Sequence, residues 1–449
     1  MKSQKFNMNR RSLLKGAAGA GVLASMSPLS RLLADAPSDH RFVLAYFLGG
    51  WDVLTGVDPR VHNTSEIDLG FDRLPASAAP FTANAGSTST TLGGVMSGLQ
   101  PHLDKCLIFR GINMDTLTHQ VGQTYMFTGA RPAGASPRRD SLEVVMATLG
   151  PLDGEGPILP TAAIAMNSYN LSMPSNASAT RLNTSGDIIP LISTFDRKLP
   201  EHLETLLDQA QSQPVTCIGD QYRQSPAGEK QLSRERLKRL QKEQAVSRLD
   251  LAADTAEMQA VRQRFGFTPQ TLTADPGNPA LNAALATQLL RTGFSRSVTV
   301  RMTNNLDTHG PEWATQQPSF QRQGFNSLSA MLSFLREDDP DMVRTTVIVV
   351  SEFSRTPKIN GSGGRDHHLT NSMVVFSGRM MPGVYGQTDP NTLGLLRFNL
   401  DNFQVNPGGQ TLQPEHIAAT ILVSVGLEGV AADSFRVSPL RQLVNTSLV

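Results

Sequence analysis

The sequence predicts an α/β fold built on a mostly parallel β-sheet flanked by helices. Three observations support this prediction: continuous apolar runs of strand length, helical stretches between them, and polar side chains directly after the runs. Apolar runs without alternation are typical of strands buried on both faces, and intervening helices are typical of parallel connections. With 449 residues, the chain can bury a large core as one domain or two.

Five apolar runs are expected to be strands of this sheet. They cover 41–50 (RFVLAYFLGG), 105–113 (KCLIFRGIN), 297–305 (SVTVRMTNN), 345–353 (TTVIVVSEF) and 371–380 (NSMVVFSGRM). Helices are predicted at 119–129, where Gly129 suits a helix end, and at 279–294 and 320–337. The alternation of the two kinds of element favours helices on both faces of the sheet.

The stretch from 225 to 266 differs because it is charged and helical in pattern. Its apolar residues recur at spacings of three and four, Ser225 and Pro226 suit a helix start, and Gly266 suits a helix end. It is interpreted as a helical insertion packed on the sheet. A coiled-coil partner site is the alternative, which we do not favour because no strict heptad is sustained.

The N-terminus is typical of a twin-arginine export signal. Arg10 and Arg11 precede a weakly apolar run at 16–26, which is too short to span a bilayer. We expect a signal at 1–36 and a mature domain at 37–449, located in the periplasm or secreted. An ordinary basic terminus before a short helix is the alternative. The export route carries folded proteins, often with a cofactor, so it is a first indication of a bound metal.

Composition excludes several classes of partner. The chain carries 40 basic and 39 acidic residues, a net charge of +1, which gives no reason to expect nucleic acid. No stretch after the N-terminus is long and apolar enough for a membrane span, so an integral membrane protein is not expected. Cys106 and Cys217 can pair after export, although Cys106 lies in a predicted core strand and a buried free thiol is equally compatible.

Side chains of the kinds that bind metals stand at the ends of four predicted strands and just before the fifth. They are Asp52, then Thr118 and His119, then Asp307 and His309, then Glu352 and Arg355, and finally Asp366, His367 and His368. Open parallel sheets bind ligands at the carboxyl ends of their strands. Any one of these residues alone is better interpreted as a cap or loop residue, but together they predict a metal site.

Mixed imidazoles and carboxylates indicate which ion to expect. Nitrogen and oxygen donors together suit zinc, manganese or iron, whereas ligation by oxygen alone suits calcium or magnesium. The expected cofactor is a divalent metal, zinc first, with manganese or calcium as alternatives. The remaining histidines, at 40, 62, 102, 202 and 416, show no comparable pattern.

Four motifs in this order, FLGGWD, DTHG, SEFSRTP and GGRDHH, resemble a known family. The resemblance is to the twin-arginine-exported bacterial proteins called domain of unknown function 1501, and it covers nearly all of the chain after residue 40. That family is placed in the alkaline phosphatase and sulfatase superfamily. The resemblance therefore implies an α/β sandwich of the alkaline phosphatase and sulfatase kind, acting on phosphate or sulfate esters.

The resemblance also implies roles for individual residues. Asp52 matches the first metal-binding aspartate of the superfamily. Asp307 and His309 stand where it has an aspartate and a histidine separated by three residues, and here they are separated by one. Glu352 can replace the acid of a later Asp-His pair, but Phe353 replaces the histidine and cannot bind a metal.

The late histidine and the nucleophile are less clearly matched. His367 or His368 can stand for the superfamily's late histidine. The nucleophile should lie ten residues before Gly129, which is the position of His119, while the hydroxyl of Thr118 is one residue away. Thr118 is therefore expected to be the displaced nucleophile, or His119 is a metal ligand in a site without a covalent intermediate.

These expectations lead to two functional hypotheses. The first is an exported, metal-dependent hydrolase of phosphate or sulfate esters, in which Arg355 holds the anionic group bidentately. Its partners would be the twin-arginine machinery and a small anionic ester. The alternative is a non-catalytic relative that keeps the fold and binds a component of the cell envelope.

Overall fold

The computed structural model describes residues 39–150, 152, 156–193, 202 and 245–448. The export signal predicted at 1–36, Cys217 and the first part (225–244) of the helical insertion predicted at 225–266 lie outside the described residues. Cys106 is described, and its thiol is buried in the sheet.

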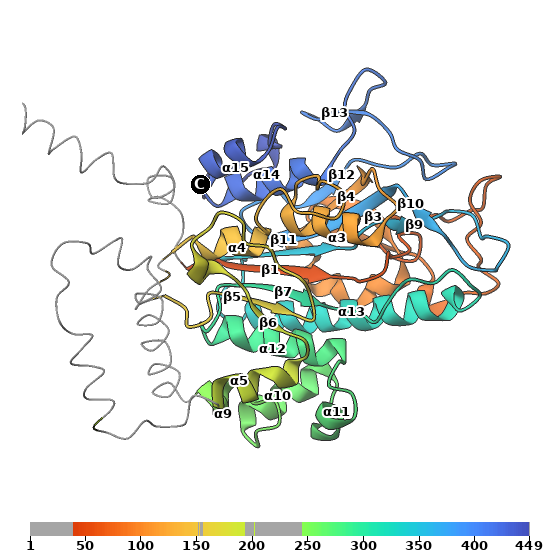
Figure 1. Cartoon of the computed structure of the whole chain (residues 1–449). Coiled ribbons are helices and arrows are strands. Elements are labelled where there is room, and N and C mark those ends of the chain that lie inside the picture. The colour runs from red at the N-terminus through yellow and green to blue at the C-terminus, as the bar shows by residue number, and fades with distance from the viewer. Residues whose placement is uncertain (1–38, 151, 153–155, 194–201, 203–244, 449) are drawn as a thin grey trace, which may run out of the picture.

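An eight-stranded sheet forms the centre of the molecule, in the order β12-β4-β11-β8-β1-β7-β5-β6 (Figure 1). The strands are β1 (Arg41–Tyr46), β4 (Cys106–Asn113), β5 (Thr161–Ile164), β6 (Thr180–Leu182), β7 (Ser297–Arg301), β8 (Thr345–Val350), β11 (Thr370–Ser377) and β12 (Gly383–Tyr385). β11 pairs antiparallel with β4 and β8, and every other pairing in this sheet is parallel. The prediction of an α/β fold with a mostly parallel sheet is confirmed.

β1 lies at the centre of the sheet because both of its faces are apolar. Val43 and Ala45 belong to one core cluster, while Phe42, Leu44 and Tyr46 belong to the other. Successive side chains of a strand point to opposite faces, so an uninterrupted apolar run fills both cores. The five predicted strands are all present, and β5, β6 and β12 were missed because each has only three or four residues.

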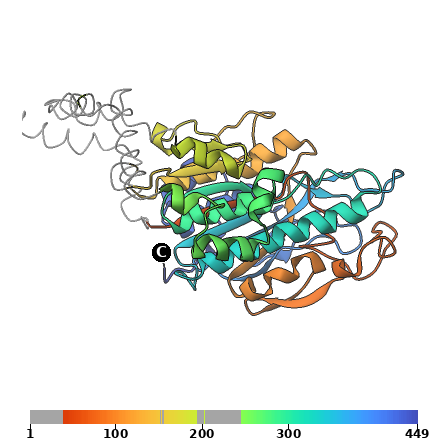
Figure 2. The same cartoon turned by 90° about the horizontal axis from the view of Figure 1, so that it is seen from below.

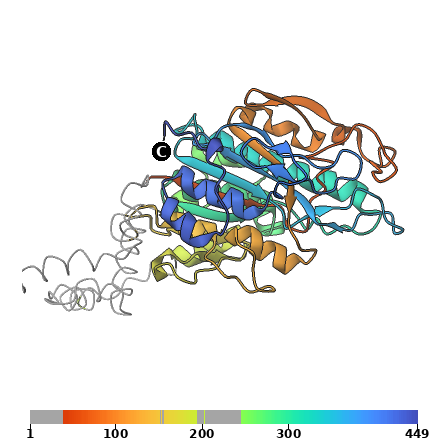
Figure 3. The same cartoon turned by 90° about the horizontal axis from the view of Figure 1, so that it is seen from above.

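Two layers of helices cover the sheet. α12 (Pro279–Arg291) and α13 (Trp313–Leu335) pack on one face, as the view from below shows (Figure 2). α3 (His119–Thr128), α4 (Leu142–Ala147), α14 (Pro414–Ser424) and α15 (Glu428–Ser434) pack on the other, as the view from above shows (Figure 3). No helix in the described ranges is long and apolar enough to cross a membrane.

The described end of the predicted insertion is broken rather than continuous. α9 (Ala245–Leu249) and α10 (Ala256–Phe265) are separate helices, because the side chain of Thr255 accepts a hydrogen bond from the backbone N–H of Met258 and starts a new helix. Gly266 ends α10 in the left-handed conformation, as predicted. The stretch that follows contains the short helix α11 (Pro269–Ala274).

Candidate metal centre

The carboxyl ends of β1, β7 and β8 bring the candidate residues to one edge of the sheet. These strands are parallel neighbours, so the chain leaves all three at the same edge, near β9 (Ser354–Arg355) and β10 (His367–His368) in Figure 1. Gly49 allows the loops after β1 and β7 to touch. A Cβ at Gly49 would lie 2.2 Å from Oδ1 of Asn305 and 2.5 Å from N of Leu306, and its φ of +105° disfavours other residues.

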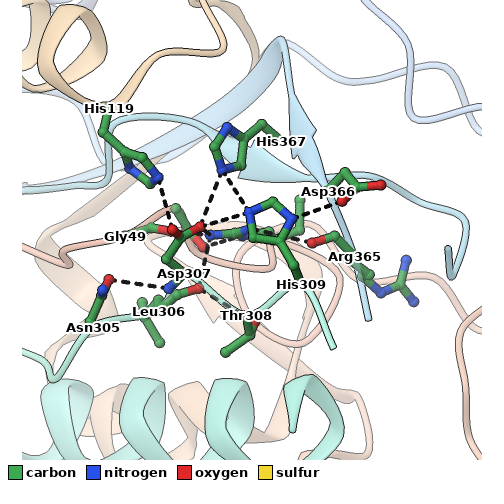
Figure 4. A network of polar contacts seen from close by, with 12 residues as sticks. Gly49, His119, Asn305, Leu306, Asp307, Thr308, His309, Arg365, Asp366 and His367 are labelled. Atoms are coloured by element: carbon green, nitrogen blue, oxygen red, sulfur yellow. Dashed lines mark hydrogen bonds and ion pairs between the residues drawn. The ribbon is translucent and has the colours of Figure 1, made fainter. Parts of the chain in front are cut away.

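Three imidazoles in this cluster each use Nδ1 as a hydrogen-bond donor. Nδ1 of His119 lies 2.8 Å from Oε1 of Glu352. Nδ1 of His309 lies 2.8 Å from Oδ1 of Asp366, and Figure 4 shows this pair beside Asp307. Nδ1 of His367 lies 2.7 Å from the carbonyl oxygen of Leu117. Ionised carboxylates and carbonyl oxygens can only accept, so these partners place the proton of each neutral ring on Nδ1.

The Nε2 atoms of the same imidazoles converge on the carboxylate of Asp307. The distances from Asp307 are 3.2 Å to His119, 3.0 Å to His309 and 3.2 Å to His367. The Nε2 atoms of His309 and His367 are only 3.1 Å apart. With Nδ1 protonated, each Nε2 presents a lone pair, so the neutral rings point lone pairs at a carboxylate and at one another.

This arrangement is unfavourable unless a cation or extra protons lie between the groups. Nε2 of His119 is buried and has no hydrogen-bond partner among the described residues. Donor atoms of His119, Asp307 and His367 all lie within 4.8 Å of one another, close enough to share one ion. Metal-binding histidines usually donate their other ring N–H to a carboxylate or carbonyl, as all three rings do here.

The surroundings keep the carboxylates ionised. Burial raises the pKa of Asp307, but the hydrogen bond and charge of Arg355, together with the contact with His367, outweigh it, and the net pKa lies well below the usual range. The hydrogen bond with His309 lowers the pKa of Asp366. The hydrogen bond with Glu352 raises the pKa of His119, so a proton and a metal would compete for this ring.

Arg355 is fully buried and joins the loops that carry the cluster. Its guanidinium donates to the carbonyl oxygens of Gly50 (2.9 Å), Arg365 (3.2 Å), Leu306 (3.0 Å) and Gly49, and to Oδ1 of Asp307 (2.7 Å). The second N–H of Nη1 has Nε2 of His309 at 3.5 Å. The expected role of Arg355 in holding an anionic group bidentately is therefore not supported, because each of its nitrogen atoms already has acceptors within the protein. It fixes the position of Asp307 instead.

Glu352 and Asp366 were both predicted to be metal ligands, but each contacts Nδ1 of a histidine instead. Oε1 of Glu352, which is fully buried, accepts hydrogen bonds from N of Gly49 at 2.9 Å and from His119. Gly122 in α3 permits this contact, because a Cβ there would lie 2.6 Å from the carbonyl oxygen of Glu352. Glu352 and Asp366 thus orient His119 and His309, respectively.

The structure does not bring Asp52 into the cluster. Its side chain is fully buried, with Oδ2 accepting from Nε1 of Trp313 at 2.7 Å and paired with Nε of Arg365 at 3.1 Å. Oδ1 accepts from N of Leu54 at 3.0 Å. Both oxygens therefore have partners, and the carboxylate forms an ion pair beneath the site. Sequence analysis did not reveal this pair, since nothing in the motif GGRDHH marks Arg365 as a partner of Asp52.

His368 and Thr118 also stand apart from the three imidazoles. His368 follows His367 in β10, and adjacent strand residues point to opposite faces. Its Nδ1 is buried without a partner among the described residues, and burial lowers its pKa. Thr118 is the exposed residue before α3 and makes no side-chain cap hydrogen bond. The ring centroid of Phe353 lies 4.2 Å from that of His367 and 4.8 Å from that of His119, so Phe353 packs against both imidazoles.

The chain matches the model of a protein family. The family model described as "Protein of unknown function (DUF1501)" matches residues 48–430, a span that includes every residue of the cluster. No curated protein matches the chain.

Proposed function

We propose, from the premise that this chain belongs to the DUF1501 family, that it is an exported, metal-dependent hydrolase of phosphate or sulfate esters. The observation that carries this proposal is the convergence of three imidazole Nε2 atoms on the carboxylate of Asp307. Membership of the alkaline phosphatase and sulfatase superfamily is part of the proposal. It is supported by the order of the motifs and by the position of the cluster at the carboxyl ends of parallel strands.

Charge balance supports a divalent cation. The carboxylates of Asp307, Glu352 and Asp366 are opposed by the single guanidinium of Arg355, which leaves two negative charges unbalanced when the three rings are neutral. A divalent ion would neutralise this excess. Three imidazoles and one carboxylate favour zinc, with manganese or iron as alternatives, and make calcium a poor fit because calcium prefers oxygen ligands alone.

The chain's residues divide the work as follows. His119, Asp307 and His367 would hold the ion, and His309 would supply a fourth donor on the open side, where its side chain is 46 % exposed. When bound, the ion would polarise the ester and lower the pKa of water. Because Arg355 has no free donor, the ester would approach the exposed side of the cluster.

One test uses protein purified through its own export route. We expect stoichiometric transition metal and hydrolysis of an aryl phosphate or aryl sulfate. His119→Ala should lose both metal and activity, whereas Thr118→Ala should lose activity but keep the metal if its hydroxyl attacks the ester. His62→Ala is the matched control, because His62 is exposed and lies outside the cluster. Retained metal in His119→Ala would contradict the assigned ligand set.

The second hypothesis, a non-catalytic relative that binds an envelope component, is favoured by two observations. Arg355 cannot hold an anionic group, and His119 occupies the expected position of the nucleophile. A metal-loaded wild-type protein that hydrolyses no phosphate or sulfate ester would support this hypothesis and reject the hydrolase.

The proposed export has a separate test. Replacing Arg10 and Arg11 together by lysine removes the arginine pair but keeps the charge, so the precursor should accumulate in the cytoplasm. Cell fractionation with an antibody to the mature domain measures the distribution. Replacing Lys2 and Lys5 by arginine is the control and should leave export unchanged. Normal export of the Arg10 and Arg11 variant would reject the assignment.

A further inference from the structure

A second polar pocket lies under α4, on the face of the sheet that is covered by α3 and α14. Glu143, in the first turn of α4, is fully buried, although glutamate is rarely buried without a partner. α4 packs against β7 and β1, and the backbone carbonyl of Glu143 accepts a hydrogen bond from Oγ of Ser297 at 2.5 Å. The carboxyl group is therefore held against the sheet rather than in solvent.

Ser141, Ser168 and Thr299 bring hydroxyl groups to this carboxyl group, and the interaction with each of them opposes the effect of burial on its pKa. Yet both carboxyl oxygens, Oγ of Ser168 and Oγ1 of Thr299 have no hydrogen-bond partner among the described residues. Ser168 is 6 % exposed and Thr299 is fully buried, so water outside the protein cannot satisfy them. A cation coordinated by these buried oxygen atoms would satisfy all of them at once.

No described cationic side chain neutralises Glu143. The charged groups on the elements around α4 have other partners. Three arginines donate elsewhere: Arg296 to the carbonyl of Ala147, Arg301 to the carbonyl of Thr303, and Arg41 to Asp338. Asp140 accepts a hydrogen bond from N of Ser172, and His119 pairs with Glu352. Burial raises the pKa of Glu143 to about 7. Above that pH the carboxylate is a buried, unpaired charge, which is costly in a protein interior.

We propose that the pocket formed by Glu143, Ser141, Ser168 and Thr299 binds a monovalent alkali cation. One carboxylate with neutral hydroxyls supplies a single negative charge, so a monovalent ion balances it and a divalent ion does not. Hard oxygen donors suit sodium or potassium and exclude the softer transition metals. This site is separate from the metal centre, since no ligand is shared between them.

The pocket is also connected to α3, the helix whose first residue is His119. N of Tyr169 donates to Oγ of Ser141 at 2.9 Å, and N of Ser141 donates to the carbonyl of Tyr169 at 2.8 Å. The hydroxyl of Tyr169 lies 3.4 Å from Oγ1 of Thr124 in α3. An ion bound at Glu143 would therefore stabilise the segment against which α3 packs.

The test measures thermal unfolding of the full mature protein in sodium, potassium and choline chloride at equal ionic strength. At about pH 8.5, sodium or potassium should raise the melting temperature by about 2 to 4 °C over choline, with saturation. At about pH 5 the carboxyl group is protonated, and the difference should vanish. A thallous-ion soak should give anomalous density between Glu143 and Thr299.

Two variants make the result specific to this pocket. Glu143→Gln should remove the cation dependence and melt at or above the wild-type temperature in choline at about pH 8.5, because the buried charge is gone. Glu428→Gln is the matched control, since Glu428 is an exposed glutamate in the first turn of α15, and it should keep the full dependence. Equal melting in all three salts, or a dependence that survives in Glu143→Gln, would overturn the proposal. Equal melting would mean that the pocket holds a proton or a water molecule instead. A dependence that survives in Glu143→Gln would mean that the cation acts elsewhere in the protein.

Discussion

A strong chelator should lower the melting temperature of the wild-type protein by about 5 °C. Bound metal stabilises the folded state by mass action, and an ion at a thousand times its dissociation constant contributes about 4 kcal/mol. For a chain of this length, that free energy corresponds to about 5 °C. The variant that combines Asp307→Asn with His309→Ala should already melt low and show no response to the chelator. Differential scanning calorimetry with metal analysis of the same samples measures both effects.

A matched double variant guards against a general effect of substitution. Asp401 and His62 are exposed residues outside the cluster, so Asp401→Asn with His62→Ala should respond to the chelator like the wild type. If the wild type melts identically with and without chelator and contains no stoichiometric metal, the metal centre is rejected. The alternative would then be that extra protons on the imidazoles balance Asp307.

The strand ends could be predicted from sequence because their physics is local. Apolar runs such as those ending at Tyr46 and Val350 identify buried parallel strands, and the carboxyl ends of such strands meet at one edge. His119 and Asp307 both follow such strands, so they are expected near one another, although the chain separates them by many residues. His367 precedes a strand instead, and it lies at the same edge because β11 runs antiparallel to β4 and β8. The structure brings these three together.

Which side chain does what within the cluster could not be predicted, because that depends on contacts between distant segments. Asp52 follows a strand like Asp307, but Arg365 and Trp313, far along the chain, use its oxygens. Glu352 lies within the strand expected at 345–353, but β8 ends at Val350, and α3 approaches closely enough for Glu352 to hold His119. A sequence shows that a carboxylate is present, but it does not show which side chain contacts that carboxylate in the folded protein.

Replacing Arg355 by lysine should be among the most damaging single substitutions at this edge of the sheet. The guanidinium donates to four backbone carbonyls and to Asp307 at once, and an ammonium group cannot reproduce this planar arrangement. Carbonyls left without a donor in a buried position, together with a misplaced charge, should cost about 3 to 5 kcal/mol. The melting temperature should fall by about 4 to 6 °C.

The same variant separates a positioning role of Arg355 from substrate binding. Because Arg355 holds Asp307, Arg355→Lys should weaken metal binding even though the guanidinium is not a ligand, and metal titration would measure this. Arg344→Lys changes a more exposed arginine, which pairs with Asp39 at 3.5 Å, and should alter neither stability nor metal affinity. If Arg355 instead contacted an anionic ester, the lysine variant would melt like the wild type, keep its metal and show only a raised KM. That combination would contradict the contacts by which Arg355 holds Asp307 and joins three loops.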